Sequence, residues 1–397
     1  MRNLNQYVRS HIHHFANPNA RHGPWPERLS TVISADSIGA AAREIKSWPG
    51  YGPTPLRSLD TLASELDIAT LWYKDEAQRF ALGSFKALGG AYAVLCLLMR
   101  ETSMSAAEIS THKARDQVAD ITVVTATDGN HGRAVAWGAQ RFGCRARIYI
   151  HAEVSAYREQ AMAELGAEVV RVDGNYDESV RQAARDARDN NWFVVSDTSW
   201  PGYTEVPAQV MAGYTVMVGE LFNQWPDGQL PTHVFVQGGV GGLAAAVIAA
   251  MWIHYGSDRP IFIVVEPADA DCLLQSATAG DLVKVDITRE TIMAGLSCGE
   301  VSPIAWSIIE LGADHFLSIT DDNVTRAMGD LATKHFSDEA IVGGESAVAG
   351  LCGLIQVATD KDLAAAIDLN PTSRVLVLGT EGATDPDIYR QATGVDP

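Results

Sequence analysis

Short apolar runs rich in β-branched and aromatic residues alternate along this chain with longer segments in which apolar residues recur at helical spacing. The short runs predict strands at 70–73, 121–126, 147–150, 168–172, 193–195, 233–236, 261–265, 316–319 and 375–378. The longer segments predict helices at 85–100, 131–141, 157–165, 176–189, 206–224, 242–255, 323–335 and 346–359. Such alternation is typical of parallel sheets covered by helices, so the chain is predicted to be an α/β protein.

Several predicted strands, such as the Ile-Phe-Ile-Val-Val run at 261–265, are apolar on both faces, which indicates central strands of a parallel sheet. Ligands of such sheets bind beyond the carboxyl ends of the strands. The unusual short motifs of this chain fall in turns that follow strands, so we interpret them as parts of one site.

The 397 residues are 47% hydrophobic and 20% charged, which is the composition of a globular protein with a sizeable core and two or three domains. Thirty Lys and Arg against 49 Asp and Glu give a net charge of −19. This charge repels nucleic-acid phosphates and anionic membrane surfaces, so we expect neither as a partner.

The first 14 residues carry His11, His13 and His14 but no apolar core of a signal peptide, and we expect a frayed end that binds no metal. No later stretch is long enough to span a membrane. The five cysteines are odd in number and lack CxxC spacing, so neither a zinc site nor a disulfide framework is expected. We therefore expect reduced thiols and a cytoplasmic protein.

Lys86 stands in the first turn of a predicted helix, within the sequence Gly-Ser-Phe-Lys-Ala-Leu-Gly-Gly at 83–90, where Ser84 can cap the helix. A cation at a helix N-terminus opposes the helix dipole, and its apolar neighbours indicate an amine held in surroundings of low polarity. Such a lysine can form a Schiff base with a carbonyl compound. The alternative is an ordinary solvated surface lysine.

A glycine-rich loop, Gly-Gly-Val-Gly-Gly at 238–242, follows the strand at 233–236 and opens an alanine-rich helix. Without Cβ atoms the backbone N–H groups can approach a phosphate, and the helix N-terminus attracts negative charge. The loop therefore predicts an anion cradle. Two alternatives stay open: a merely tight turn, or the dinucleotide fingerprint Gly239-x-Gly241-x-x-Ala244 with Glu266 in the ribose-binding place.

A third motif, Thr-Ala-Thr-Asp-Gly-Asn-His-Gly at 125–132, lies between a predicted strand and a predicted helix. Locally it is also typical of an Asx turn in which Asn130 caps the helix. Because this turn is expected at the same sheet edge as the glycine loop, the carboxylate of Asp128 and the carboxamide of Asn130 would converge on one site.

Taken together, these motifs resemble those of the diaminopropionate ammonia-lyases, a family of fold type II pyridoxal-phosphate enzymes related to the tryptophan synthase β chain. The resemblance spans nearly the whole chain and rests on the segments 84–86, 127–133, 196–204, 238–242, 265–267, 293–300, 344–346 and 380–382. Serine and threonine dehydratases typically show Ser-x-Gly-Asn in the third motif. Asp128 adds a carboxylate beside the same Gly-Asn, which points to a positively charged substrate.

The resemblance implies two open, twisted, mostly parallel sheets flanked by helices. It places a small domain at 88–213 between the two parts of a large domain, 1–87 and 214–397, with pyridoxal 5'-phosphate in the cleft between them. It also implies a homodimer. The activity implied is α,β-elimination of 2,3-diaminopropionate, as both enantiomers, to pyruvate and two molecules of ammonia.

The resemblance further implies roles for individual residues. Lys86 would carry the cofactor and then move a proton at Cα or Cβ of the substrate. Asp128 and Asp197 would hold the substrate's β-ammonium group and act as acid or base from opposite sides of Cα, although Asp197 also fits a common turn. The implied cofactor-binding residues are Lys86, Asn130, Gly238, Gly239, Val240, Gly241, Gly242, Glu345 and Thr380.

Within this set, Asn130 would donate to the cofactor's phenolate oxygen, and Thr380 would be a neutral hydroxyl partner of the pyridine nitrogen. A neutral partner makes a weaker electron sink, which suits elimination rather than transamination. The alternatives are a plain strand-terminal Thr380 and a Glu345 that pairs only with a helix dipole.

Three other functions stay open from the sequence. The first is a lyase that resembles serine or threonine dehydratase, and the second is a nicotinamide-dependent dehydrogenase that uses the Gly239 fingerprint. The third is an amino-acid-binding homologue without catalysis. Cys272 and Cys298 lie in motif-bearing loops, and we expect free thiols rather than a bridge.

Overall fold

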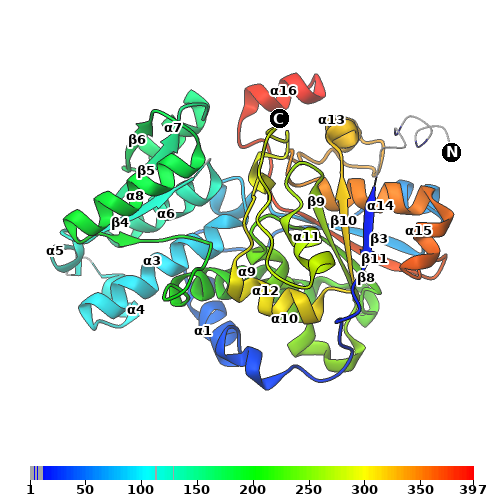
Figure 1. The fold of residues 1–397 in the computed structure, drawn as a ribbon, viewed down its shortest axis with the longest axis horizontal. Helices are drawn as coiled ribbons and strands as arrows, with labels where there is room; N and C mark the ends of the chain where they lie inside the picture. The colour runs from blue at the N-terminus through cyan, green and yellow to red at the C-terminus, as the bar shows by residue number, and fades with distance from the viewer. Residues whose placement is uncertain (1–3, 5–6, 8–11, 112–113, 128) are drawn as a thin grey trace. The chain divides into compact units, whose positions relative to one another are not determined.

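The computed structural model describes residues 4, 7, 12–111, 114–127 and 129–397. The chain divides into two compact units. The first unit consists of Met1–Ala35, Gly52–Gly83 and Met217–Pro397, and the second of Asp36–Tyr51 and Ser84–Val216. Each unit contains one β-sheet (Figure 1).

The first unit is built on a seven-stranded sheet in the order β1-β10-β9-β8-β11-β3-β2. Five central strands run parallel, and β1 and β2 pair antiparallel at the two edges. The strands are β1 (His13–Ala16), β2 (Leu56–Ser58), β3 (Thr70–Asp75), β8 (His233–Gln237), β9 (Ile261–Pro267), β10 (His315–Ile319) and β11 (Arg374–Gly379). The parallel strands confirm the strand predictions that were made from the apolar runs. The apolar pattern does not reveal the two short edge strands.

The segment that begins at His13 forms β1, so the expectation of a frayed chain end is wrong for His13 and His14. His14 is paired with Leu317 of β10, and its Nε2 lies 3.1 Å from Nδ1 of His315, 301 residues later. A pairing partner so distant in sequence leaves no local signal. His11 lies outside the described residues.

Helix α14 of the first unit packs on β8, β9, β10 and β11, whereas α10 packs on β8 and on α12. The helices are α2 (Asp60–Glu65), α10 (Gly242–Tyr255), α11 (Cys272–Ala279), α12 (Pro303–Gly312), α13 (Val324–Ala332), α14 (Ala349–Thr359), α15 (Lys361–Ala366) and α16 (Pro386–Thr393). Helix α9 (Glu205–Gln224) contains the boundary between the units. Helix α10 begins and ends where the sequence predicts and is almost wholly apolar and buried, as an interior helix requires.

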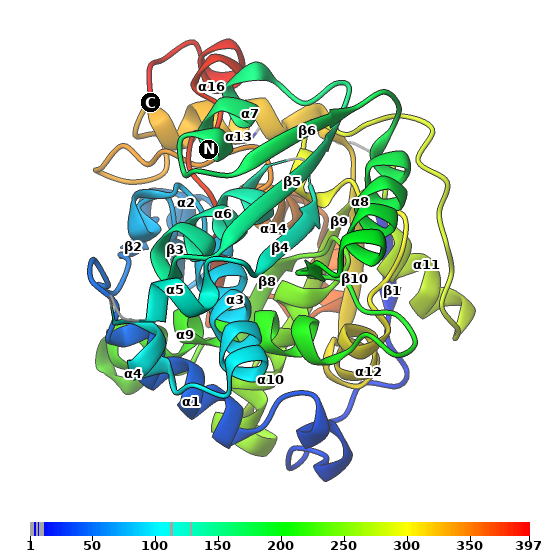
Figure 2. The ribbon, with the colours of Figure 1, turned by 90° about the vertical axis from the view of Figure 1, so that its left-hand side faces the viewer.

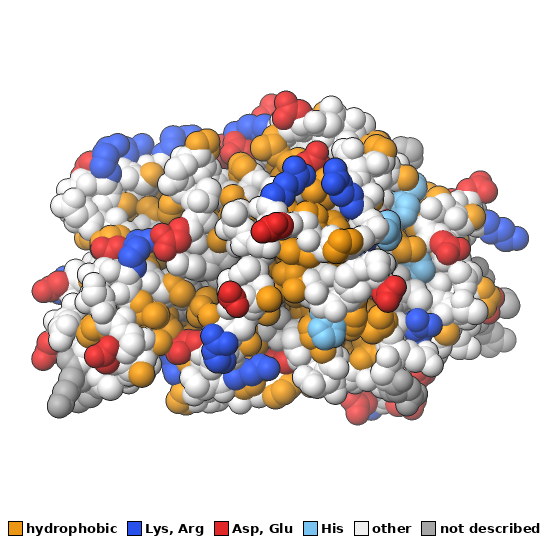
Figure 3. Space-filling view, turned by 90° about the horizontal axis from the view of Figure 1, so that it is seen from below, with side chains coloured by type: hydrophobic (Ala, Val, Ile, Leu, Met, Phe, Trp, Pro, Cys, Tyr) orange, Lys and Arg blue, Asp and Glu red, His pale blue; other side chains and the backbone are white. Residues whose placement is uncertain are grey.

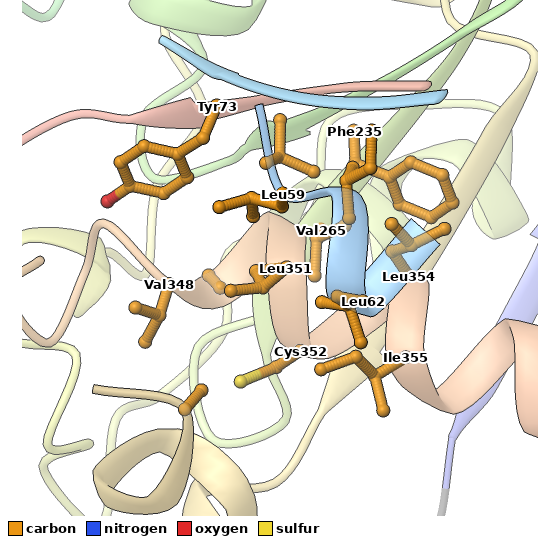
Figure 4. Close-up of a cluster of buried hydrophobic side chains, with 14 of the residues drawn as sticks. Leu59, Leu62, Tyr73, Phe235, Val265, Val348, Leu351, Cys352, Leu354 and Ile355 are labelled. Atoms are coloured by element: carbon orange, nitrogen blue, oxygen red, sulfur yellow. The ribbon is translucent and has the colours of Figure 1, made fainter. Parts of the chain in front are cut away.

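An apolar core lies between α14 and the sheet of the first unit (Figure 4). Leu351, Leu354 and Ile355 of α14 lie beside Phe235 of β8 and Val265 of β9, and all five side chains are fully buried. Burial of one such side chain contributes about 1.5–3 kcal/mol. This packing fixes the two strands that lead into the glycine loop and to Glu266.

The second unit is built on a four-stranded, entirely parallel sheet in the order β6-β5-β4-β7 (Figure 2). Its strands are β4 (Thr122–Ala126), β5 (Arg145–His151), β6 (Glu168–Val172) and β7 (Phe193–Val194). Its helices are α1 (Ala35–Lys46), α3 (Lys86–Thr102), α4 (Ala106–Ile109), α5 (Arg115–Val118), α6 (Asn130–Phe142), α7 (Ala156–Ala163) and α8 (Tyr176–Asn190). All four strands occur at the predicted positions. The two mostly parallel sheets confirm the predicted fold class.

Helices α3 and α6 of the second unit pack closely through glycines. A Cβ added at Gly90 of α3 would lie 2.7 Å from Cβ of Ala134, and one added at Gly138 of α6 would lie 2.8 Å from Cα of Ala91. Real Cβ atoms do not approach other atoms so closely, so glycine is required at both positions. Within the second unit, this contact places the helix that begins at Lys86 against the helix that begins at Asn130.

The surface carries charges of both signs. On the face drawn in Figure 3, Asp and Glu side chains are interspersed with Lys and Arg and with hydrophobic side chains. In the part of the chain that the structure describes, none of the helices has both the length and the apolar character needed to span a bilayer.

Candidate active site

The amine of Lys86 contacts the carboxylate of Asp197. The Nζ of Lys86 lies 2.5 Å from Oδ2 of Asp197, and the two side chains are only 22% and 19% exposed. The rings of Phe85 and Tyr214 lie 5.6 and 5.9 Å from this Nζ. Ser84 accepts the backbone N–H of Lys86 at 3.3 Å, but the N-cap of α3 is Phe85 and makes no side-chain cap, so the prediction that Ser84 caps this helix is wrong. Lys86 is therefore an enclosed lysine, and the alternative of a freely solvated one is wrong.

Asp197 lies in the turn that follows β7, and this turn is itself ordered by hydrogen bonds. Ser196 accepts the N–H of Thr198 at 3.1 Å, and the N–H of Ser196 donates to the Tyr203 hydroxyl at 3.0 Å. Burial alone would raise the pKa of Asp197, but the charge of Lys86 and its hydrogen bond to the carboxylate hold this pKa well below its usual range. The turn therefore presents an ionised carboxylate to Lys86.

His131 is a third member of this cluster, and the sequence analysis assigns it no role. It is buried, its Nε2 lies 2.9 Å from the carbonyl oxygen of Val195, and its Nδ1 lies 3.9 Å from Oδ2 of Asp197. Burial lowers its pKa below the ordinary histidine value. Its place directly after Asn130 in a turn rich in polar residues is the signal that could have identified it.

Asn130 is the first residue of α6, and the helix cap at this end comes from elsewhere. The N-cap is Gly129, which makes no side-chain cap, so the alternative in which Asn130 caps the helix is wrong. Instead, the hydroxyl of Thr127 accepts the N–H groups of Gly129 at 3.1 Å and of Gly132 at 3.4 Å. Asp128 lies outside the described residues, so its role stays a prediction.

In the first unit, the glycine loop joins β8 to the N-terminus of α10. Gly241 has a φ of +99°, a left-handed conformation that favours glycine. The N–H of Gly238 donates to Val265 at 2.8 Å, whereas no described residue accepts the N–H groups of Gly239, Val240, Gly241 or Gly242. Gly241 and Gly242 are buried, so their N–H groups call for an external acceptor. A phosphate fits this cradle.

The carboxylate of Glu266 already accepts hydrogen bonds from the protein's own backbone. Its two carboxylate oxygens accept the N–H groups of Leu273 and Leu274, each at 2.8 Å, and the side chain is fully buried. It therefore satisfies the N-terminus of α11 and has no surface at which to bind a ribose. The dinucleotide interpretation of the glycine loop is wrong for this reason.

Gln237, the last residue of β8, ties the glycine loop to the other predicted residues of the first unit. Its Nε2 lies 2.6 Å from the carbonyl oxygen of Leu378, 3.0 Å from that of Ala347 and 3.5 Å from the hydroxyl of Thr380. Thr380 is buried directly after β11. The sequence analysis does not identify Gln237, although a polar residue at the end of an apolar strand is a usable signal.

Glu345 is buried near the same loops, but it lies outside any helix. Helix α14 begins at Ala349, so the alternative in which Glu345 pairs with the dipole of a helix first turn is wrong. The neighbouring backbone is held by Glu381, whose carboxylate accepts the N–H of Ser346 at 3.0 Å. The backbone carbonyl of Glu381 accepts the N–H of Gly344 at the same distance.

Lys74, another lysine that follows an apolar run, is fully engaged inside the first unit. Its Nζ lies 2.7 Å from the carbonyl oxygen of Thr54, 2.7 Å from Oε2 of Glu220 and 2.8 Å from Oε1 of Gln224. An ammonium group has three N–H donors, and all three are used. Lys74 therefore cannot replace Lys86 as a cofactor lysine.

Cys272 and Cys298 form no disulfide bond, as expected, and both lie beside Gly239. The Sγ of Cys272 lies 3.7 Å from the carbonyl oxygen of Gly239, and a Cβ added at Gly239 would lie 3.2 Å from Sγ of Cys298. Within the described ranges, His, Cys, Asp and Glu form no group of three that could hold a metal ion.

The donor set fits pyridoxal phosphate. Buried N–H groups of the glycine loop suit a phosphate, an enclosed lysine amine suits an aldehyde carbon, and the buried hydroxyl of Thr380 suits a ring nitrogen. Lys86, Asn130, His131 and Asp197 belong to the second unit, and the glycine loop, Glu345 and Thr380 belong to the first.

Known proteins match this chain over most of its length. The family described as "Pyridoxal-phosphate dependent enzyme" matches residues 47–381. Diaminopropionate ammonia-lyase of Escherichia coli (strain K12) is 40% identical over 367 residues, which cover 91% of this chain and 92% of that protein. Diaminopropionate ammonia-lyase of Salmonella typhimurium is 38% identical over 87% of this chain and 88% of that protein.

The match extends to three dimensions. A crystal structure of the Escherichia coli diaminopropionate ammonia lyase, in complex with an aminoacrylate-PLP azomethine reaction intermediate, superposes with a TM-score of 0.88. The superposition covers 97% of both chains at 36% sequence identity. The chain therefore belongs to the pyridoxal-phosphate dependent enzymes, in the family of the diaminopropionate ammonia-lyases.

Proposed function

We propose that this protein is a lyase that converts 2,3-diaminopropionate and water into pyruvate and two molecules of ammonia, and that it accepts both enantiomers. The observation that carries the proposal is the contact between Lys86 and the ionised carboxylate of Asp197, 2.5 Å apart. The diaminopropionate ammonia-lyases of Escherichia coli and Salmonella support the same substrate.

When bound, pyridoxal phosphate supplies an electron sink for the electron pair left on Cα after a proton is removed. The N–H groups of residues 239–242 would hold its phosphate, and the amine of Lys86 would hold its aldehyde carbon. The hydroxyl of Thr380 would face its ring nitrogen, and Asn130 would donate to its phenolate oxygen. Glu345 would lie near the ring.

Asp197 would recognise the charge that distinguishes this substrate. Its carboxylate now balances the cationic amine of Lys86, and once that amine is engaged with the cofactor, the carboxylate can accept the β-ammonium group instead. A hydrogen bond to a charged group contributes about 1.5–3 kcal/mol. Asp197 should therefore favour diaminopropionate over the neutral hydroxyl of serine by about 10- to 100-fold.

The same residues would move the protons of the elimination. Lys86 and Asp197 are candidates to take the Cα proton, and the predicted second carboxylate, Asp128, would serve from the opposite side. The leaving β-nitrogen departs as ammonia because it carries its full complement of protons. Two carboxylates on opposite sides of Cα would explain the use of both enantiomers.

The experiment that tests the proposal is an absorbance spectrum of the purified protein with cofactor, followed by assays of pyruvate and ammonia from D- and L-2,3-diaminopropionate. We expect two ammonia per pyruvate, and a kcat/KM for diaminopropionate well above that for serine. A protein that releases no pyruvate from diaminopropionate would contradict the proposal. A higher kcat/KM for serine would favour the dehydratase-like alternative.

We also propose a cytoplasmic homodimer. None of the five cysteines forms a disulfide bond, which supports a reducing compartment. The homodimer rests on the family resemblance. Light scattering coupled to size-exclusion chromatography should give twice the chain mass of 42.7 kDa, and a mass equal to one chain would contradict it.

A further inference from the structure

The imidazole of His131 has a defined tautomer. Its Nε2 lies 2.9 Å from the carbonyl oxygen of Val195, and a carbonyl oxygen can only accept, so Nε2 carries the hydrogen. In the neutral ring, Nδ1 is then a bare acceptor. This atom is buried and has no hydrogen-bond partner among the described residues.

Two acceptors therefore face each other inside the second unit. The Nδ1 of His131 lies 3.9 Å from Oδ2 of Asp197, and neither atom has a hydrogen to donate while both groups are deprotonated. Once a single proton enters the pair, one of the two atoms becomes a donor to the other. If Nδ1 and Oδ2 then move about 1 Å closer together, they form an ordinary hydrogen bond. The pair is thus built to receive one proton.

The same carboxylate oxygen that faces His131 also contacts Lys86. Oδ2 of Asp197 lies 2.5 Å from Nζ of Lys86, which joins Lys86, Asp197 and His131 into one continuous chain of titratable groups. The charged groups that act on His131 are Asp197 from the turn after β7 and Lys86 from α3. The phenol of Tyr214 from α9 interacts with both of these groups.

We propose that His131 is a positioning residue that holds the proton of Asp197 during turnover. When Asp197 removes the Cα proton, the C–H bond breaks, the electron pair stays on Cα, and an O–H bond forms on the carboxylate. The proton then passes to Nδ1 of His131 and leaves Asp197 ionised beside the substrate. It returns through Asp197 to the amine of Lys86, since the leaving nitrogen already carries its full complement of protons, and no oxidant or reductant is needed.

This inference rests on the proposed function, since it assigns Asp197 as the base for one enantiomer. Burial lowers the pKa of His131, and the charge of Asp197 acts in the opposite direction. The imidazole is therefore neutral near pH 7 and able to take a proton. Because the proposed path from His131 to the substrate runs through Asp197, His131 should affect the enantiomer that depends on Asp197 and leave the other unchanged.

The test variant is His131→Gln. The Nε2 of glutamine can still donate to the carbonyl of Val195, but an amide cannot take up a proton at the position of Nδ1. The matched control is His233→Gln, because His233 is also buried and its Nε2 lies 2.8 Å from the carbonyl oxygen of Ile367. Cofactor absorbance and circular dichroism of both holoenzymes check that the variants are folded.

We expect kcat/KM of His131→Gln to fall about 100-fold or more for the enantiomer that Asp197→Asn disables, and to stay unchanged for the other. With the affected enantiomer, the wild-type rate should fall as pH drops through the pKa of His131, and His131→Gln should lack this acidic limb. The control His233→Gln should keep the limb and the ratio of enantiomer rates. Equal losses for both enantiomers, or an acidic limb retained in His131→Gln, would overturn the proposal.

A second measurement separates this inference from the proposed function. Nitrogen NMR of holoenzyme labelled at histidine should show that Nε2 of His131 carries the hydrogen. In Asp197→Asn the pKa of His131 should be lowered further, because that variant removes the charge that raises this pKa. An unchanged titration in Asp197→Asn would refute the coupling, whatever the substrate is. If diaminopropionate gives no pyruvate while the coupling is present, the proposed function fails and the His131–Asp197 pair stands.

Discussion

Replacement of Lys74 by Met should strongly destabilise the first unit. Lys74 lies 2.7 Å from Oε2 of Glu220, and the guanidinium of Arg79 contacts both carboxylate oxygens of Glu220 at 2.8 Å. Arg79 also pairs with Glu76 at 2.8 Å. None of these four side chains is more than 1% exposed, so solvent does not screen their charges.

The magnitude follows from the charge balance of this buried network. Two cations and two carboxylates are matched in the wild type, and Lys74→Met leaves two carboxylates with Arg79 alone. An uncompensated buried charge costs about 3–5 kcal/mol, which is large against a typical total stability of about 5–15 kcal/mol. The double variant Lys74→Met/Glu220→Gln restores the balance. It should therefore be more stable than the sum of the two single changes predicts, by about 0.5–3 kcal/mol.

Urea unfolding of the holoenzyme followed by far-ultraviolet circular dichroism measures these differences. The control is Lys284→Met, because Lys284 pairs with Glu300 on the surface, where the side chains are 57% and 63% exposed. The control should change the free energy of unfolding by no more than about 0.5 kcal/mol. A Lys74→Met loss below about 1 kcal/mol, or strict additivity in the double variant, would refute the reasoning.

Other variants test the site directly. Lys86→Ala should remove the absorbance band of the lysine-bound cofactor, and a persisting band would mean that another lysine carries it. Asp128→Asn should lower diaminopropionate turnover at least about 100-fold with the cofactor absorbance unchanged, and full turnover would refute its role. Gly241→Ala should weaken cofactor binding about tenfold, because Gly241 has a φ of +99° and the new Cβ would lie 2.8 Å from the side chain of Ile309. An unchanged Kd in cofactor titrations would contradict this. Because the pKa of Asp197 is lowered on folding, the stability that it contributes should be complete above about pH 4 and should decline as pH falls towards the lowered value. Asp197→Asn should therefore destabilise the protein to urea less at pH 2 than at pH 7, and equal losses at both would refute this.

The amino-acid sequence by itself determined the parallel α/β architecture and the position of the glycine loop. Each central strand is an apolar run flanked by turn residues, and this local pattern reports burial wherever the strand later pairs. The loop at 238–242 could also be predicted from local sequence, because its four glycines lie between a strand and a helix and act through their own backbone N–H groups. Lys86 also stood out locally, as a cation in the first turn of an apolar helix.

Only the tertiary structure decided which of these residues meet. Asp197 lies 111 residues after Lys86, and its contact depends on where β7 ends and on how α3 and α6 pack through Gly90 and Gly138. The same holds for the engagement of Lys74 and Glu266 with the protein's own groups. The first excludes Lys74 as a cofactor lysine, and the second excludes the dinucleotide alternative that the sequence left open. Strand order and helix packing are set by contacts between segments that are distant in the sequence. Hydrophobic periodicity is a local pattern, so it does not reveal these contacts.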